Sequence, residues 1–338
     1  MKYVTIIDIA KALGISKSTV SRALAGDTHN VKPATMQLIC ETADRMGYQR
    51  NELAVNLRKQ NTRNIGIIIP EVVTSFFMNF IQQAQRDLRE QGYRVLIAVS
   101  NEDPEQEREN LLMFEQCRVE GILISVCHKS KLVDLYRKIM AGGTPIVFFD
   151  RVVGVLEASQ VRIDDYLMAS FMVEALIRSG CRQIVHLAGP EYISNGSERH
   201  RGYRDALAKF KLTYDARYVI AGGLDAEQGG RAMEQFLGLG LPFDAIFGFT
   251  ETATLGAKSV LQKLHYRIPE DVSLCCISGT ALCTLVHPTL TAVEQPVVEI
   301  AHQACRLLLQ QIQQPEMPKE QVVLRGEMVM RDSIRQKA

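Results

Sequence analysis

The stretch TIIDIAKALGISKSTVSRALAG, residues 5–26, carries the strongest structural signal in this chain of 338 residues. From Ile6 to Leu13, apolar residues recur at the i, i+3, i+4 and i+7 positions that form one buried face of a helix. Gly14 tolerates the positive φ that a chain reversal needs, and Ser16 suits the N-cap of a second helix. The pattern predicts two short helices joined by a sharp turn.

The second of these helices would carry small polar side chains and one arginine, Arg22, on the face opposite its apolar residues. Short side chains let a helix approach the bases in the DNA major groove, and an arginine can bind a guanine edge through two hydrogen bonds. An ordinary helical hairpin with a solvated polar face has the same spacing. The pattern by itself leaves both interpretations open.

Charge is distributed unevenly along the chain. Residues 1–62 contain nine lysines and arginines against five acidic residues, whereas the rest contains 30 against 33. A basic head on a mildly acidic body is typical of a small nucleic-acid-binding module joined to a larger domain.

Composition narrows the class of protein further. The eight cysteines are scattered without the spacing of metal ligands, so we expect free thiols in a reducing compartment and no metal site. No apolar run reaches the roughly 18 residues of a membrane span, and the N-terminus does not resemble a signal peptide. We therefore expect a cytoplasmic protein without a membrane partner.

Two further helices are expected before the body. Pro33 and Gly47 mark the start and the end of a third helix, whose apolar face is expected to hold Met36, Ile39, Cys40 and Ala43. Residues Asn51–Arg58 could form a fourth, but so short a helix does not hold in water without packing. We expect this hinge helix to fold only when DNA or a second copy covers its apolar side. The expected domains are an all-α helix-turn-helix head over residues 1–50 and a hinge helix and linker over residues 51–62.

From residue 63 onward the pattern changes to apolar strands that alternate with amphipathic helices. This alternation predicts parallel sheets covered by helices on both faces, and two successive runs of it predict a two-lobed α/β body over residues 63–338. We expect the chain to cross between the lobes near residues 151–161, to return near 290–296, and to end in a last strand over 322–330. Lobe 1 would then span about residues 63–160 and 292–322, and lobe 2 about 161–291 and 323–338.

Polar residues follow several of the predicted strands. In parallel α/β sheets, ligands bind at the carboxyl ends of the strands, and two lobes form a cleft between those ends. Taken singly, each of these residues could instead cap a helix or carry a surface charge. Because they come from five separate strand ends, we expect them to line a small-molecule cleft. The residues are Ser75, Phe76, Asp150, Arg151, Arg199, Thr250, Glu251 and Ser278.

Longer motifs follow one another along almost the whole chain. They are VTIIDIAKALGISKSTVSRAL at residues 4–24, MGY at 46–48, TRNIGIIIP at 62–70, VEGILIS at 119–125, PIVFFDR at 145–151, HPTLTAVEQP at 287–296 and VLRGEMVMRDS at 323–333. This ordered series resembles the lactose/galactose repressor (LacI/GalR) family.

The resemblance implies a transcription regulator, a repressor of a catabolic operon, with a periplasmic-binding-protein-like body and without catalysis or a cofactor. It also implies a homodimer that binds a pseudo-palindromic operator in double-stranded DNA, is nucleoid-associated when bound, and answers to a small-molecule effector. Leu57 matches the family's hinge leucine, and an apolar side chain inserted in the minor groove unstacks a base step and bends the DNA. The candidate DNA contacts are Thr5, Ser16, Lys17, Ser18, Thr19, Ser21, Arg22, Asn30, Arg50, Asn51, Ala54 and Leu57.

The chain departs from the family pattern at the hinge and in the cleft. Arg50 replaces the usual proline, and Thr250–Glu251 replaces an Asn-Asp pair. Ser278 stands where sugar-binding members have an aspartate, whose carboxylate accepts two hydrogen bonds from sugar hydroxyls. A carbohydrate or a derivative remains the expected effector. The alternatives are a phosphorylated or acidic metabolite bound by Arg151 and Arg199, or a purine-like corepressor.

Two other classes of protein share features of this sequence. A solute-binding protein could share the two-lobed body, and an α/β enzyme could share its sheets. The basic head argues against the first. The second lacks support, because the sequence has no Gly-rich phosphate loop that opens a helix after a strand and no GxSxG or HExxH motif.

Overall fold

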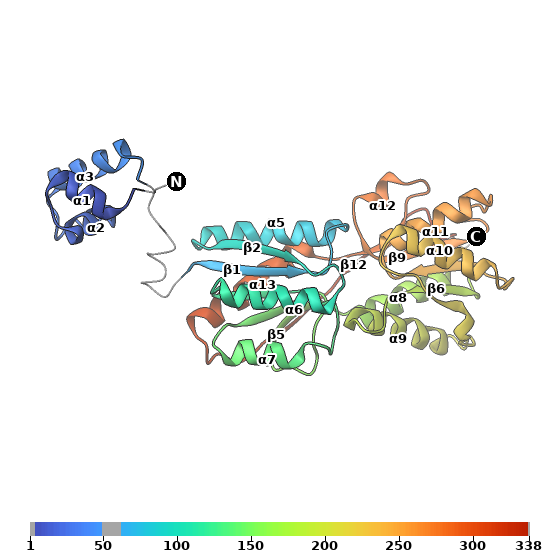
Figure 1. Ribbon diagram of the computed structural model, residues 1–338. Coiled ribbons are helices and arrows are strands. Elements are labelled where there is room, and N and C mark those ends of the chain that lie inside the picture. The colour runs from blue at the N-terminus through green and yellow to red at the C-terminus, as the bar shows by residue number, and fades with distance from the viewer. Residues whose placement is uncertain (1–3, 49–61, 337–338) are drawn as a thin grey trace. The chain divides into compact units, whose positions relative to one another are not determined.

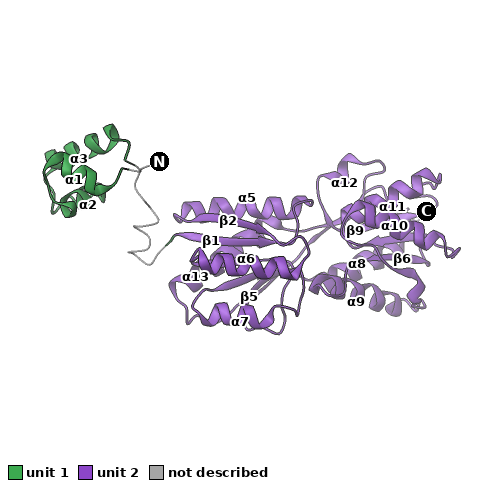
Figure 2. Cartoon of the chain, in the orientation of Figure 1, with its two compact units in different colours: residues 1–62 green, residues 63–338 purple. Residues whose placement is uncertain are grey.

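The computed structural model describes residues 4–48 and 62–336. The chain divides into two compact units, residues 1–62 and residues 63–338 (Figures 1 and 2). The expected hinge helix falls outside the described residues, and so do four candidate DNA contacts: Arg50, Asn51, Ala54 and Leu57. Within the described ranges, every helix is too short or too polar to cross a membrane.

The head contains helices α1 (Ile6–Leu13), α2 (Lys17–Leu24) and α3 (Pro33–Arg45). Thr5 caps α1, because its side chain accepts a hydrogen bond from the Asp8 N–H while the Asp8 carboxylate accepts one from the Thr5 N–H. Gly14 ends this helix with a φ of 65°. The two short helices and the turn predicted from residues 5–26 are confirmed.

The three helices of the head bury one shared core. Ile9, Val20 and Ile39 are fully buried in it. Cys40 was expected to face this core, but it is exposed, and Thr42 is buried instead. Thr42 lies three residues after Ile39 and therefore on the same side of α3, whereas Cys40 is rotated by about 100° around the helix axis.

The first lobe of the body is a parallel sheet between two layers of helices (Figure 1). Its elements are β1 (Asn64–Ile69), α5 (Ser75–Glu90), β2 (Arg94–Val99), α6 (Pro104–Gln116), β3 (Gly121–Ile124), α7 (Val133–Ala141), β4 (Ile146–Phe149), β5 (Ser159–Ile163), α13 (Val297–Gln313) and β11 (Gln321–Leu324). The strand order is β11-β5-β4-β3-β1-β2, and all pairs are parallel. Helices α5 and α13 cover one face, and α6 and α7 cover the other. The central strands β3 and β4 are buried along their whole length, as expected of a sheet covered on both faces.

The second lobe repeats this architecture. Its elements are α8 (Asp165–Arg178), β6 (Ile184–Ala188), α9 (Ser194–Lys209), β7 (Val219–Ala221), α10 (Ala226–Leu237), β8 (Ala245–Gly248), α11 (Glu251–Lys263), β9 (Ser273–Gly279), α12 (Leu282–Leu285), β10 (Thr291–Glu294) and β12 (Glu327–Val329). Helices α8 and α9 cover one face of the sheet, and α10 and α11 cover the other. Only the edge pair β10–β12 among the described strands is antiparallel, so the expected parallel sheets are found except at this edge.

The chain crosses between the lobes three times, after Ile163, Glu294 and Leu324. The expected boundaries at 160/161, 291/292 and 322/323 fall inside β5, β10 and β11, so each lies too early. The single last strand expected over residues 322–330 is in fact two strands, β11 and β12, one in each sheet.

Segment 151–161 was expected to cross between the lobes, but it stays in the first lobe. Val153 and Leu156 pack in its core, and β5 pairs with β4. An apolar run predicts a strand, but it does not reveal the sheet in which that strand pairs, because pairing depends on contacts with residues outside the run.

Candidate functional site

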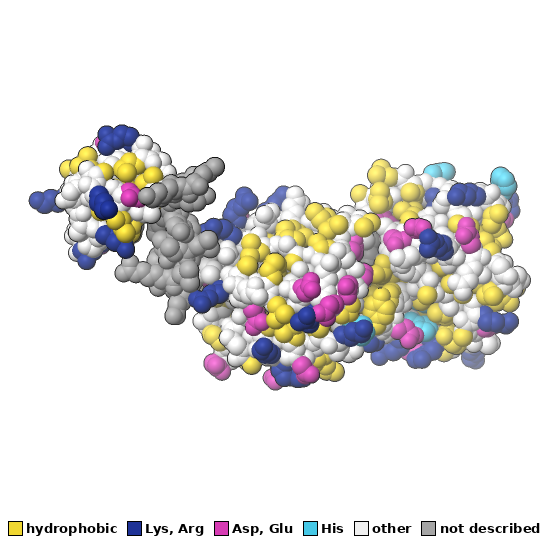
Figure 3. Space-filling model, in the orientation of Figure 1, with side chains coloured by type: hydrophobic (Ala, Val, Ile, Leu, Met, Phe, Trp, Pro, Cys, Tyr) yellow, Lys and Arg dark blue, Asp and Glu magenta, His cyan; other side chains and the backbone are white. Residues whose placement is uncertain are grey.

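Helix α2 presents the polar face that the sequence predicts. Lys17, Ser18 and Arg22 are exposed, whereas Val20 and Ala23 on the opposite side are buried in the core of the head. The space-filling view shows lysine and arginine side chains at the surface of this unit (Figure 3). The face thus combines short polar side chains with positive charge, which suits contact with DNA.

Hydroxyl groups cluster at the start of α2. The Ser16 Oγ accepts a hydrogen bond from the Thr19 N–H at 3.1 Å. It also lies 2.7 Å from the Ser18 Oγ and 2.8 Å from the Thr19 Oγ1. A helix N-terminus with exposed hydroxyls is suited to a phosphate contact, because N–H groups and hydroxyls both donate to phosphate oxygens.

Asn30, a candidate phosphate contact, folds back onto its own loop. Its side-chain amide donates a hydrogen bond to the Asp27 carboxylate at 2.8 Å. That carboxylate also accepts bonds from the backbone N–H groups of His29 and Asn30, each at 3.2 Å. The Asn30 side chain is the main cause of a lowered pKa of Asp27. Within the described residues, Asn30 therefore shapes the loop after α2.

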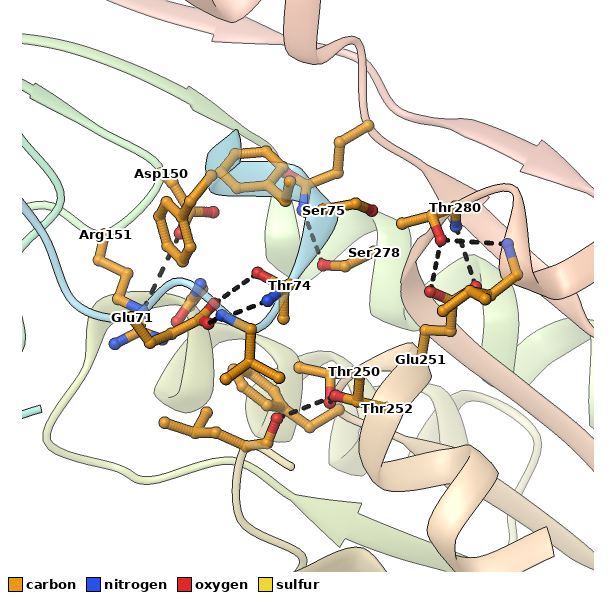
Figure 4. Close-up of a pocket in the computed structure, with 18 of the residues that line it drawn as sticks. Glu71, Thr74, Ser75, Asp150, Arg151, Thr250, Glu251, Thr252, Ser278 and Thr280 are labelled. Atoms are coloured by element: carbon orange, nitrogen blue, oxygen red, sulfur yellow. Dashed lines mark hydrogen bonds and ion pairs between the residues drawn. The ribbon is translucent and has the colours of Figure 1, made fainter. Parts of the chain in front are cut away.

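All eight residues expected to bind a ligand line one cavity in the body, which encloses about 620 Å³, part of it open to solvent (Figure 4). Strands of both sheets direct them there. Asp150 and Arg151 follow β4 of the first lobe, whereas Thr250 and Glu251 follow β8 of the second. The geometry expected from the strand-end rule is thus present, with contributions from both lobes.

The cavity has further lining residues that sequence reasoning missed. Some of them also follow strands: Glu71 follows β1, Leu224 follows β7 and Gln295 follows β10. The strand-end rule would have found these three if it had been applied to every strand. The missed residues are Glu71, Val73, Thr74, Phe77, Asn195, Leu224, Phe249, Thr252, Thr280, Leu282 and Gln295.

Arg199 of α9 is held in place by two acceptors within the second lobe. Its Nε donates to the Asp165 Oδ1 at 2.7 Å, and its Nη1 donates to the Phe249 carbonyl oxygen at 2.6 Å. The guanidinium carbon lies 4.5 Å from the centroid of the Phe249 ring. The Nη2 is buried without a hydrogen-bond partner in the protein. Because such a donor is costly to leave unsatisfied, it points to an acceptor on a ligand.

Arg151 is bound to a carboxylate of its own lobe. Its Nη1 donates to both oxygens of Glu102, at 2.9 and 2.8 Å. Its Nε lies 3.9 Å from the Asp150 Oδ2, too far for a hydrogen bond. The guanidinium is therefore neutralised mainly by Glu102, a residue outside the set predicted from sequence.

Asp150 is a buried carboxyl in an unusual backbone conformation. Its φ is 57°, in the left-handed region that few residues other than glycine adopt, though Asp and Asn tolerate it. Burial raises the pKa of Asp150 to about 6, while the positive charge of Arg151 opposes this shift. The side chain is therefore largely ionised at neutral pH and ready to accept a hydrogen bond.

Two of the expected ligand residues, Glu251 and Thr250, line the cavity but use their polar atoms within the protein. The Glu251 carboxylate accepts hydrogen bonds from the Thr280 N–H, the Thr280 Oγ1 and the Cys283 Sγ, at 3.1, 2.6 and 2.8 Å. Thr250 caps α11, since its side chain accepts a bond from the Ala253 N–H. These two residues fasten the loop and the helix that form the cavity wall.

Ser278 and Phe76 complete the wall. Ser278 has a φ of 63°, and its Oγ accepts a hydrogen bond from the Gln295 Nε2 at 2.7 Å. Phe76, in the first turn of α5 beside Ser75, packs edge-on against Phe77 with 5.1 Å between ring centroids. Phe76 therefore adds an apolar surface to an otherwise polar cavity.

Asp150→Asn is expected to stabilise the body by about 3 kcal/mol at pH 8. A carboxyl whose pKa is raised on folding contributes full stability below its unfolded pKa of 3.8 and loses that contribution as the pH rises through about 6. The advantage of asparagine should therefore grow between pH 4 and 6 and then stay constant. The unfolding midpoint in urea, measured across this range, checks the result.

Asp134→Asn is the matched control, because this side chain is 97% exposed. Its effect on the midpoint should stay small across this range. If the Asp150→Asn difference were flat between pH 4 and 8, Asp150 would not be a buried group that titrates in this window.

Comparison with known protein families accounts for both units. Residues 5–51 match the family model described as bacterial regulatory proteins, lacI family, and residues 173–334 match that of a periplasmic binding protein-like domain. The chain is 30% identical over 309 residues to Catabolite control protein A of Priestia megaterium, covering 90% of this chain and 91% of that protein. It is 28% identical over 333 residues to the HTH-type transcriptional repressor CytR of Escherichia coli (strain K12), covering 98% and 96%.

Solved structures agree with this assignment. The transcriptional regulator CelR in complex with cellobiose matches with a TM-score of 0.75 and 25% identity, over 98% of this chain and 99% of that one. The lac repressor dimer bound to operator has the same fold, with a TM-score of 0.84 at 21% identity over 98% of this chain and 99% of that one. The chain therefore belongs to the lacI family of bacterial regulatory proteins and is a DNA-binding transcription regulator.

Proposed function

We propose that this regulator is a homodimeric repressor whose affinity for a pseudo-palindromic operator depends on a carbohydrate, or a carbohydrate derivative, held between the lobes of the body. The observation that carries the effector site is the cavity where strand ends of both sheets meet. The solved structure of CelR, which has the same fold, is a complex with cellobiose. This favours a carbohydrate as the effector here. Operator binding would take place in the cytoplasm, on the nucleoid.

On the DNA side, the polar face of α2 would enter the major groove. Lys17, Ser18 and Arg22 are the proposed base contacts, because their side chains are exposed on one side of a helix whose other side is buried. Thr5 and Ser16 are proposed to contact phosphates from the two helix starts. The roles of Thr19, Ser21, Asn30 and the hinge residues Arg50, Asn51, Ala54 and Leu57 rest on the sequence match.

On the effector side, acceptors and donors face each other across the cavity. Asp150 would accept a hydrogen bond from a ligand hydroxyl, and the unpartnered Nη2 of Arg199 would donate one. Phe76 would pack against an apolar face of the ligand. Glu251, Thr250 and Ser278 would act by holding the wall in shape.

Coupling between the sites would follow from the way the lobes are joined. The lobes are connected by three short crossings, so a ligand that contacts both lobes can favour one relative orientation. The first lobe directly follows the segment that leads to the head, and a change in lobe orientation would therefore alter the spacing of two heads in a dimer.

The test begins with selection of operator sequences from random duplexes by the purified full chain. Operator affinity is then measured by fluorescence anisotropy with and without D-ribose, D-glucose, D-galactose and cellobiose. We expect one of these sugars to raise the melting temperature and to change operator affinity. Asp150→Ala should remove both effects, whereas the exposed control Asp134→Ala should keep them.

Two results would refute the proposal. If no sequence is selected above random DNA, the chain is not a sequence-specific binder under these conditions. If a sugar stabilises the body but leaves operator affinity unchanged, the cavity is a binding site that does not control the head.

A further inference from the structure

We infer that the Glu102 carboxylate neutralises Arg151 and thereby disfavours anionic ligands. The cavity would then take an uncharged ligand rather than a phosphorylated or acidic one. This inference rests on the proposed function of the cavity as an effector site. Glu102 is not itself a lining residue, and it acts on the ligand through Arg151.

The backbone before α6 is shaped to bring this carboxylate to Arg151. Asn101 and Glu102 have φ values of 49° and 58°, so two consecutive residues other than glycine adopt the left-handed conformation. L-residues adopt it only at an energetic cost, and strain of this kind concentrates at functional sites. A backbone hydrogen bond from the Glu102 N–H to the Pro70 carbonyl oxygen, at 3.1 Å, fixes the turn.

The resulting ion pair joins segments that are distant in sequence. Both Glu102 oxygens accept from the Arg151 Nη1, and the Arg151 side chain is only 5% exposed against 23% for Glu102. A charge-assisted pair at this level of burial is screened little by salt. An anionic ligand would therefore meet a guanidinium whose charge Glu102 already offsets, although its buried Nε has no hydrogen-bond partner in the protein.

The other arginine of the cavity is also neutralised, because Arg199 pairs with Asp165 at 2.7 Å. The remaining ionisable residues that line the cavity are Glu71, Asp150 and Glu251, all of them acidic. An incoming phosphate or carboxylate would therefore meet a surplus of negative charge. A hydroxyl group avoids this repulsion, since it can donate to Asp150 or accept from the Arg199 Nη2.

The experiment compares the full chain with Glu102→Gln, using inorganic phosphate and D-glucose 6-phosphate as probes. Both probes are titrated by thermal shift and calorimetry at constant ionic strength. The matched control is Glu105→Gln, which removes the same charge from an exposed ion pair with Arg108 on α6. Phosphate stabilises proteins non-specifically, so the difference between the two variants is the quantity that counts.

We expect Glu102→Gln to gain affinity for at least one probe by about tenfold or more, because a freed buried guanidinium can make charge-assisted hydrogen bonds to phosphate. Wild type and Glu105→Gln should respond alike and weakly. Adding Arg151→Met to Glu102→Gln should abolish the gain, since the anion would have lost its partner.

Specific binding of either probe by wild type at submillimolar concentration would overturn the inference. So would a Glu102→Gln chain that keeps its native circular dichroism but gains no affinity. A gain that survives Arg151→Met would place the anion elsewhere and would also refute it. None of these results depends on operator binding, so they are distinguishable from a failure of the proposed function.

Discussion

Replacing Arg199 by methionine is expected to lower the free energy of unfolding of the body by about 3–5 kcal/mol, the usual loss when one partner of a buried ion pair is removed. Arg199 is only 1% exposed and Asp165 is 3% exposed, so the remaining carboxylate could not regain solvent. The Phe249 carbonyl oxygen would lose its donor as well. Methionine keeps most of the side-chain volume, and the loss would therefore report on charge rather than on packing.

Urea unfolding of the full chain, followed by far-UV circular dichroism, measures this effect. The control is Arg201→Met, on the same helix but in an exposed pair with Glu198, where a loss of no more than about 1 kcal/mol is expected. Burial raises the pKa of Asp165, and the nearby Arg199 opposes this. Without Arg199 the carboxyl should become protonated more easily, so the loss should shrink as the pH falls.

A second variant makes the interpretation decisive. Asp165→Asn combined with Arg199→Met leaves no buried charge, and it should recover part of the stability that Arg199→Met loses. If the double variant were as unstable as the sum of both changes, the buried charge would not be the source of the loss.

Arg22→Ala is expected to weaken operator binding by about 1–3 kcal/mol, or roughly fivefold to 150-fold, and to relax the base preference at one position. Arg22 is exposed on the polar face of α2, so its removal should not disturb the core of the head. Fluorescence anisotropy with the selected operator, with its single-base variants and with random DNA measures both effects.

Arg45→Ala removes the same charge from the last turn of α3, at a residue outside the candidate DNA contacts, and serves as the control for net charge. It should weaken binding to operator and to random DNA by the same factor. That factor should be smaller than the loss that Arg22→Ala causes on the operator. An equal loss on operator and on random DNA for Arg22→Ala would make Arg22 a phosphate contact rather than a base contact.

The head was predicted well because its signals are local. Thr5, Gly14 and Ser16 act on residues no more than a few positions away, and helical hydrogen bonds span four residues. Apolar spacing was therefore enough to find α1, α2 and their turn. It failed at Cys40 and Thr42, where the choice of the buried position depends on how α3 packs against its neighbours.

The alternation of strands and helices in the body was predicted correctly. Which strands pair with one another was not. Strand β5 pairs with β11, so that Val161 lies beside Val322, which is 161 positions later in the chain. No local composition marks the three crossings between lobes. The boundaries were therefore placed inside strands rather than after them.

In the cleft, the sequence predicted where the residues lie but not which contacts their side chains make. Strand ends predicted where Asp150, Arg199 and Glu251 would gather, because parallel strands all point their carboxyl ends to one edge. They did not predict that the Glu251 carboxylate would bind Thr280, nor that Glu102 would neutralise Arg151. Each of those contacts joins residues that are far apart in the chain.

The sequence alone therefore determined the helix-turn-helix head, the class of the body and the family, because short-range periodicity and ordered motifs carry that information. The tertiary structure decided which strands share a sheet, which cavity residues remain available to a ligand, and how the charges of the cavity are balanced. The physical reason is that hydrogen bonds and ion pairs in the cavity depend on distances in space, which no spacing along the chain specifies.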